Sequence, residues 1–145
     1  MGYYVTTQSS TFTIPAENLD EAYTRMCQLN QNNDMKRGGS WPRPDNIVGP
    51  HEKIWFSWMD WNYPETCKDA GEILEQLGFG ISYDDGGDLY IDYYDSKTGS
   101  EDDFLNAISD LASGEIEWKG EDGAFWKQVF GDKEMKTYNG RIVYE

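Results

Sequence analysis

Histidine and cysteine are scarce in this chain of 145 residues, which has one histidine, His51, and two cysteines, Cys27 and Cys67. A structural zinc site needs several such ligands at short spacings, and neither C-x-x-C nor H-x-x-x-H occurs. A catalytic thiol needs an activating base, but His51 lies in a proline- and glycine-rich stretch. We therefore expect no metal site and no catalytic cysteine. Both thiols are expected to be reduced and buried on apolar helix stripes.

Catalytic motifs are missing as well, since the chain has no P-loop, G-x-S-x-G, G-x-G-x-x-G or H-E-x-x-H pattern. Pairs of carboxylates arise by chance among 27 acidic residues, so they do not by themselves indicate a glycoside hydrolase. Asp84, Asp85 and Asp88 surround a glycine turn but lack the spacing of a calcium-binding EF-hand loop. The expectation is a protein that is not an enzyme and has no cofactor.

No apolar run approaches the roughly 18 residues that a membrane helix needs, and the first ten residues lack the regions of a signal peptide. A hydrophobic content of 38%, with 15% aromatic residues, is enough to form a core, whereas the mean hydropathy of -0.77 indicates a very polar surface. We expect one cytoplasmic domain over residues 1–145 that does not contact a membrane.

The clearest pattern lies between Trp55 and Phe79, a stretch that holds three of the six tryptophans. Apolar residues recur there at spacings of three and four as far as Leu77, which predicts one helix beginning at Pro64 and closed by Gly78. The aromatic run from residue 55 to Tyr63 is too dense for every ring to point inward. These rings either cover the core or leave one or two side chains as an exposed contact patch.

On the N-terminal side of this helix, residues 3–14 are rich in β-branched and aromatic side chains and predict a strand. Apolar spacing from Leu19 to Leu29 predicts a helix, with Asn18 as its N-cap. On the C-terminal side, two strands over residues 79–83 and 88–94 should form a hairpin around the turn at residues 84–87. The residues of the second strand expected to face the core are Leu89, Ile91 and Tyr93.

A further helix should begin after Ser100 and stop at Gly114. Short strands near residues 116–118, 125–130, 135–138 and 142–144 then predict a C-terminal β-meander. This order favours an α+β fold, with a mainly antiparallel sheet and about three helices packed on one face. The side chains expected to be buried are Trp118, Phe104, Ile108, Leu74 and Leu77.

Residues 32–53 have no periodic pattern and predict a long irregular loop. This loop carries basic and aromatic side chains that could hold an anionic ligand by charge and stacking, or could simply connect two elements. If the loop binds a small molecule or nucleotide, its candidate ligand-binding residues are Lys36, Arg37, Trp41, Arg43 and His51.

Acidic residues concentrate in one part of the chain. Between Asp60 and Asp122 there are 18 acidic residues and three lysines, whereas the rest of the chain is balanced. Such asymmetry favours docking on a basic protein surface and disfavours direct nucleic-acid binding, although carboxylates also serve solubility alone. The candidate partner-binding residues are Asp84, Asp85, Asp88, Asp92, Asp95, Glu101, Asp102, Asp103, Glu121 and Asp122.

The two ends of the chain carry short motifs, Met1-Gly2-Tyr3-Tyr4 at the start and Gly120-Glu121-Asp122-Gly123, Trp126 and Gly140-Arg141-Ile142-Val143-Tyr144 near the end. In these motifs the chain resembles short uncharacterised proteins of actinobacteria and their phages, a group that has no assigned functional residues. The resemblance implies a bacterial or phage source and a compact accessory role. It is compatible with a phage inhibitor of a host nucleic-acid-handling or defence complex, and also with a virion or assembly component.

Overall fold

The computed structural model describes residues 2–42, 46–131 and 134–140, and its centre is an antiparallel sheet of seven strands. In the sheet, one side of β6 pairs with β5, and its other side pairs with both β1 and β2. From β1 the sheet continues through β7 and β8 to β9. The strands are β1 (Tyr4–Ser10), β2 (Thr13–Ile14), β5 (Phe79–Tyr83), β6 (Leu89–Lys97), β7 (Gly114–Gly120), β8 (Phe125–Gly131) and β9 (Glu134–Asn139).

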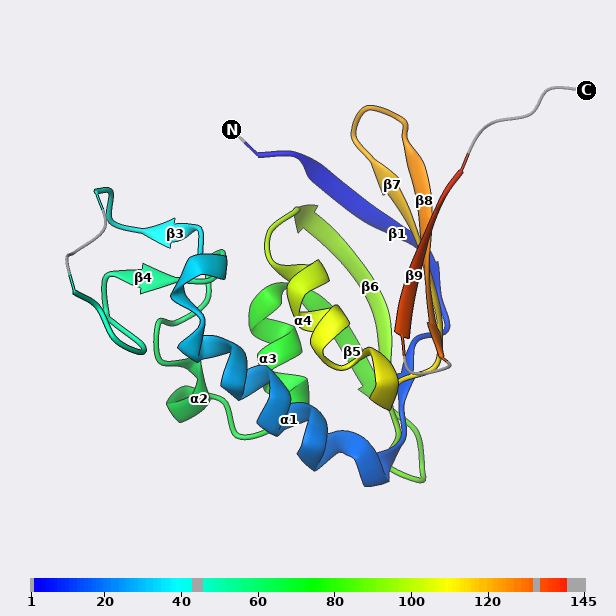
Figure 1. Cartoon of the computed structure of the whole chain (residues 1–145). Coiled ribbons are helices and arrows are strands. Elements are labelled where there is room, and N and C mark those ends of the chain that lie inside the picture. The colour runs from blue at the N-terminus through cyan, green and yellow to red at the C-terminus, as the bar shows by residue number, and fades with distance from the viewer. Residues whose placement is uncertain (1, 43–45, 132–133, 141–145) are drawn as a thin grey trace, which may run out of the picture.

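Three helices, α1, α3 and α4, lie on one side of this sheet (Figure 1). The helices are α1 (Leu19–Gln28), α2 (Tyr63–Thr66), α3 (Ala70–Leu77) and α4 (Glu101–Ala107). Single 3-10 turns cover Ala16–Asn18, Leu29–Gln31, Asn33–Met35 and Ser109–Leu111. The predicted α+β fold with helices on one face is therefore confirmed, as is the meander of β7, β8 and β9. The strand predicted at residues 142–144 lies outside the described residues.

The core forms between the helices and the inner face of the sheet. All five side chains predicted to be buried, from Leu74 on α3 to Trp118 on β7, are inaccessible or nearly so. Aromatic rings fill the space between them: the Phe56 and Phe104 centroids lie 5.1 Å apart, and Trp118 contacts Tyr94 edge-on at 5.6 Å. The first contact joins α4 to the segment after β4, and the second joins β6 to β7 within the sheet.

The strand predicted over residues 3–14 is interrupted. One side of β1 pairs with β6 only as far as Thr6, whereas the other side pairs with β7 from Val5 to Ser10, with a bulge between Thr7 and Ser9. The chain rejoins β6 around β2. Between the two strands the Phe12 side chain is fully buried against Phe130, with ring centroids 4.8 Å apart. Burial of this ring accompanies a break that β-propensity alone did not predict.

The single helix predicted from Pro64 to Leu77 is wrong, because the structure has α2 and α3 with an extended link between them. Cys67 has extended backbone angles, and Asp69 begins the second helix by accepting a hydrogen bond from the Glu72 backbone N–H at 2.9 Å. An N-cap aspartate satisfies an amide that has no partner inside the helix, so it favours a new start. The predicted end is correct, because Gly78 closes α3 with φ 116°.

Tyr93 was predicted to face the core, but 59% of it is exposed. Leu89 and Ile91 are buried as predicted; the pairing of β5 with β6 then slips by one residue between Gly80 and Ile81. The extra residue on β6 reverses the alternation of its side chains, so Tyr94 takes the inward position. The bulge thus places Tyr93 on the outer face of the sheet.

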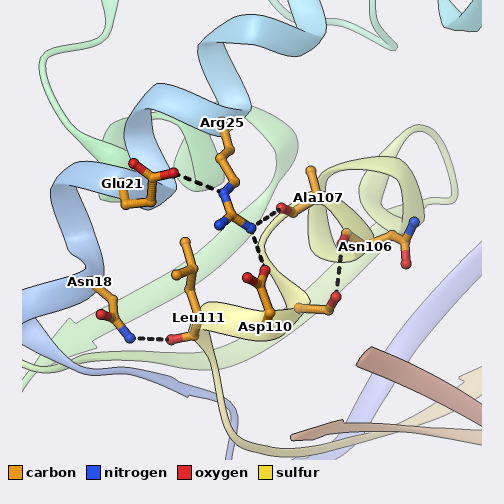
Figure 2. A network of polar contacts seen from close by, with 8 residues as sticks. Asn18, Glu21, Arg25, Asn106, Ala107, Asp110 and Leu111 are labelled. Atoms are coloured by element: carbon orange, nitrogen blue, oxygen red, sulfur yellow. Dashed lines mark hydrogen bonds and ion pairs between the residues drawn. The ribbon is translucent and has the colours of Figure 1, made fainter. Parts of the chain in front are cut away.

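The helix caps also differ in part from prediction. Asn18 and Ser100 precede their helices but make no side-chain capping bond. Figure 2 shows that Asn18 instead donates to the Leu111 carbonyl at 3.0 Å, next to a network in which Arg25 bridges Glu21 and Asp110. α4 ends at residue 107, well before Gly114, which has φ 93° and opens β7. These contacts tie α1 to the turn after α4.

Residues 32–53 are less irregular than predicted. A two-stranded pair, β3 (Gly38–Gly39) with β4 (Ile54–Trp55), closes the segment at its base. In the aromatic run that follows, Phe56 and Tyr63 belong to the core, whereas Trp58 and Trp61 are exposed. The run therefore contributes to the core and to the surface.

Candidate functional site

The most acidic part of the structure runs from α2 through β6. Residues 60–95 contain ten acidic side chains and one lysine, Lys68. The ion pairs among the described residues involve Arg25, Lys127 and Lys136 with acids outside this span. Among the described residues, no carboxylate of residues 60–95 therefore forms an ion pair with a lysine or arginine side chain.

Part of this charge gathers around Tyr83, at the end of β5. The Tyr83 ring reaches across α3 at Gly71, where an added Cβ would lie 2.2 Å from the tyrosine hydroxyl. The pKa of Tyr83 is raised, mainly because its side chain is partly buried against the helix. The nearby carboxylates of Asp69, Glu75 and Glu72 raise it further. We call this surface the acidic edge and define it as Asp69, Glu72, Glu75, Asp84 and Asp85 around Tyr83.

The hairpin turn gives the acidic edge a fixed end. Asp84 accepts hydrogen bonds from the backbone N–H groups of Gly86 and Asp88, both at 3.0 Å, and from the Tyr90 hydroxyl at 3.1 Å. These donors, the Asp88 N–H first, lower the pKa of Asp84. Asp88 accepts from the Ala16 backbone N–H at 2.8 Å. Asp85 is exposed and takes no part in these bonds.

The other predicted acidic residues do not join this surface. Asp92 and Asp95 lie on the outer side of β6, where Asp92 accepts from Ser82 at 3.0 Å. α4 begins after the far end of β6, and the β7–β8 turn lies beside that end across β1. Both places are roughly 25 Å from the hairpin, given the usual rise per strand residue. Those two places hold Glu101, Asp102, Asp103, Glu121 and Asp122.

Several of these distant carboxylates bond within the fold. Glu101 is buried and accepts from Thr98 and from the Gly99 backbone, and Asp102 accepts from Gln128 at 2.7 Å. Glu121 accepts from the Tyr4 backbone at 3.0 Å, and Asp122 accepts from the Tyr3 hydroxyl. Burial raises the pKa values of Glu101 and Asp103. These contacts give most of this group a role in the fold.

The candidate ligand loop is divided between core and surface. Only 1% of Lys36 is exposed, and its ammonium donates inward to the Asn30 carbonyl at 2.7 Å and to Asn33 Oδ1 at 2.9 Å. Arg37 donates to the Asp34 carbonyl, His51 Nδ1 accepts from the Lys53 backbone, and Trp41 is 70% exposed. Arg43 lies outside the described residues.

Two of the cavities in the described structure are lined by Arg37 of this loop. One of about 290 Å³ is lined by Trp41, Arg37 and Ile54, among others. A larger one of about 640 Å³ lies between Arg37, Trp58 and Asp103. Ligand pockets typically range from about 300 to 1,000 Å³, so only the second has clear room for a nucleotide-sized molecule.

The two cysteines are free thiols. Cys67 is buried as predicted, and burial raises the pKa of its thiol to about 11, whereas Cys27 is half-buried. A thiol with a raised pKa carries little thiolate at neutral pH and is a poor nucleophile. Burial also raises the pKa of Cys27, so neither thiol is activated as a nucleophile.

Sequence reasoning missed Asp69, Glu72, Glu75 and Tyr83 as members of one surface. The three acidic residues are spaced three apart in the sequence, which by itself predicts only a solvated helix face. Their proximity to Tyr83 depends on the packing of β5 against α3. No family model matches the chain, and neither a curated protein nor a solved structure matches it. In the described ranges, every helix is too short or too polar to cross a membrane.

Proposed function

We propose that the protein is a non-catalytic binding protein whose acidic edge docks on a basic surface of another protein. The observation that carries the proposal is the unneutralised charge at this place: five carboxylates surround Tyr83, and none forms an ion pair within the described part of the chain. Charge of one sign, concentrated on a fixed surface, attracts an oppositely charged partner and orients it during approach.

The edge also has the composition of a contact surface. Tyr83 is 49% exposed and lies among the carboxylates, and a half-exposed tyrosine supplies both apolar area and a polar tip. Because a nucleic acid would be repelled by this surface, the expected partner is a protein rich in lysine and arginine. A basic phosphate-binding surface of a host nucleic-acid-handling protein has this chemistry, which agrees with the resemblance to phage proteins.

A small-molecule function for the loop around Trp41 has less support. Lys36 is held by the core, and the cavity beside Trp41 is small. The cavity between Arg37 and Trp58 has the volume for a ligand, but it holds charges of both signs, with Asp34 and Asp103 beside the arginine. An anionic ligand would meet both carboxylates there.

The test compares two charge reversals of equal size. Glu75→Lys with Asp85→Lys changes the acidic edge, and Glu17→Lys with Glu52→Lys is the control; all four residues are exposed. Binding of a synthetic peptide rich in lysine and arginine is measured by calorimetry from about 50 to 300 mM salt. We expect the edge variant to bind about tenfold more weakly than the control at low salt. Equal losses would show that net charge alone is responsible, and the acidic edge would then not be a docking site.

A further inference from the structure

One edge of the large sheet is open. β5 pairs with β6 along one side and packs on α3, and no described strand pairs with its other side. An unpaired strand edge presents a row of main-chain donors and acceptors that can accept another strand. β5 is therefore a place where the sheet could be extended.

The direction of the β5 main chain follows from its partner. In the pair formed by Ile81 and Ile91, the Ile91 N–H points away from β5 and donates to the Phe12 carbonyl at 3.2 Å. Opposed residues of an antiparallel pair either both bond to each other or both point outward. The Ile81 N–H and C=O therefore face the open side, and the alternation along the strand gives Tyr83 the same direction.

The two ends of the sheet differ in how they are protected against pairing. β9, at the other end, carries Glu134 and Lys136 within the strand. β5 reads Phe-Gly-Ile-Ser-Tyr, with neither a charge nor a proline to block an incoming strand. Protection comes instead from its neighbours, because Asp69, Glu72 and Glu75 lie along α3 and Asp85 at the turn.

These carboxylates select among possible occupants. A second copy of this chain has a net charge of -15 and would bring the same acidic residues to the edge. Like charges brought together at an interface oppose association, whereas a positively charged strand is attracted. The charge therefore admits a basic segment and excludes self-pairing.

We propose that β5 binds an extended lysine- and arginine-rich segment of a partner protein, which adds to the sheet as an eighth strand beside Ile81 and Tyr83. This inference rests on the proposed function and names its binding mode. Main-chain hydrogen bonds hold the segment, and alternate side chains select it. Its basic residues at every second position lie against the α3 carboxylates.

The experiment uses the full chain and a nine-residue peptide that alternates lysine with valine or threonine. Amide hydrogen exchange is followed by NMR with and without the peptide. The amides of Ile81 and Tyr83 should exchange about tenfold more slowly in the complex, since each gains a partner. A peptoid with the same side chains keeps the charge, but its N-substituted main chain cannot donate to the Ile81 and Tyr83 carbonyls and cannot form a β-ladder, so it should give no such protection.

A matched pair of variants tests the same contact by affinity. Tyr83→Pro and Tyr83→Ala both remove the ring, but only proline removes the outward N–H, and edge strands tolerate proline at such positions. We expect Tyr83→Pro to bind the peptide about tenfold more weakly than Tyr83→Ala. If the proline variant does not fold, the amide exchange rates of the unmodified protein still decide whether the peptide adds to β5 as a strand.

The outcomes separate this inference from the proposed function. Salt-dependent peptide binding that Glu75→Lys with Asp85→Lys weakens, without protection at Ile81 and Tyr83, overturns strand addition and leaves the docking function standing. Absence of binding at every salt concentration overturns both. Protection of the two amides in the free protein, increasing with its concentration, assigns the edge to a second copy and also overturns the inference.

Discussion

The indole N–H of Trp118 donates to Gln128 Oε1 at 2.9 Å, and both side chains are almost completely buried. The amide nitrogen of Gln128 donates in turn to Asp102 at 2.7 Å. The chain of bonds runs from β7 through β8 to the first turn of α4. It satisfies a buried indole and anchors the helix on the sheet.

Gln128→Leu should reduce the free energy of unfolding by about 1–3 kcal/mol, because it leaves the buried Trp118 N–H without an acceptor. Urea unfolding at neutral pH measures the loss. Gln8→Leu makes the same chemical change at an exposed position on β1 and is the control. Equal midpoints for the two variants would mean that the network adds nothing to stability.

Lys36→Met should also destabilise the protein by about 1–3 kcal/mol, since the Asn30 carbonyl and Asn33 Oδ1 both lose a charged donor. The exposed Lys53 provides the control, and Lys53→Met should change the unfolding midpoint little. Thermal and urea unfolding of both variants measure the difference. A Lys36 variant as stable as the Lys53 variant would contradict the inward role.

How much the sequence predicts depends on whether the deciding contact is local. Apolar spacing identified the stripe of α3, and glycine identified the turn at Gly78, because both signals lie within a few residues. Lys36 was a candidate ligand-binding residue because its loop is basic and aperiodic, but its long side chain instead reaches inward to the Asn30 carbonyl and Asn33. The prediction that Tyr93 faces the core was wrong for a similar reason. One extra residue at a bulge reverses the inward and outward alternation of the side chains that follow it, and composition does not reveal the bulge.

The same distinction holds for the candidate site. The excess of acidic residues was evident from counting, but it could not show that Asp102 bonds to Gln128 while Asp85 makes no such contact. Pairing between residues far apart in the chain decides which carboxylates remain available. The acidic edge depends on Tyr83 crossing α3, a contact that forms only when β5 packs on the helix.

Leu74→Ala tests whether α3 is central to the core. Leu74 is fully buried, and its truncation should cost about 2–5 kcal/mol, depending on how far its surroundings collapse into the cavity. Glu75→Ala, at the next, exposed position, controls for the change in helix composition. If the urea midpoint of the Leu74 variant corresponds to a loss below about 0.5 kcal/mol, α3 packs peripherally.

Asp84 should make the stability of the protein depend on pH. Backbone donors in the hairpin lower its pKa below the usual value of about 3.9, so the folded state holds its proton less tightly than the unfolded state. The stabilisation is therefore fully present above about pH 4 and is lost as the pH falls through the folded-state pKa. Asp84→Asn can still accept these bonds but does not titrate.

The free energy of unfolding of the wild type and of Asp84→Asn should therefore differ most near neutral pH and converge as the pH falls below the folded-state pKa of Asp84. Urea unfolding at intervals between about pH 2 and pH 7 measures this convergence. Asp85→Asn, next in the chain but outside the bonding network, controls for the loss of one carboxylate from the turn. A difference between the wild type and Asp84→Asn that stays constant with pH, or grows in acid, would show that the hairpin does not prefer the ionised carboxylate.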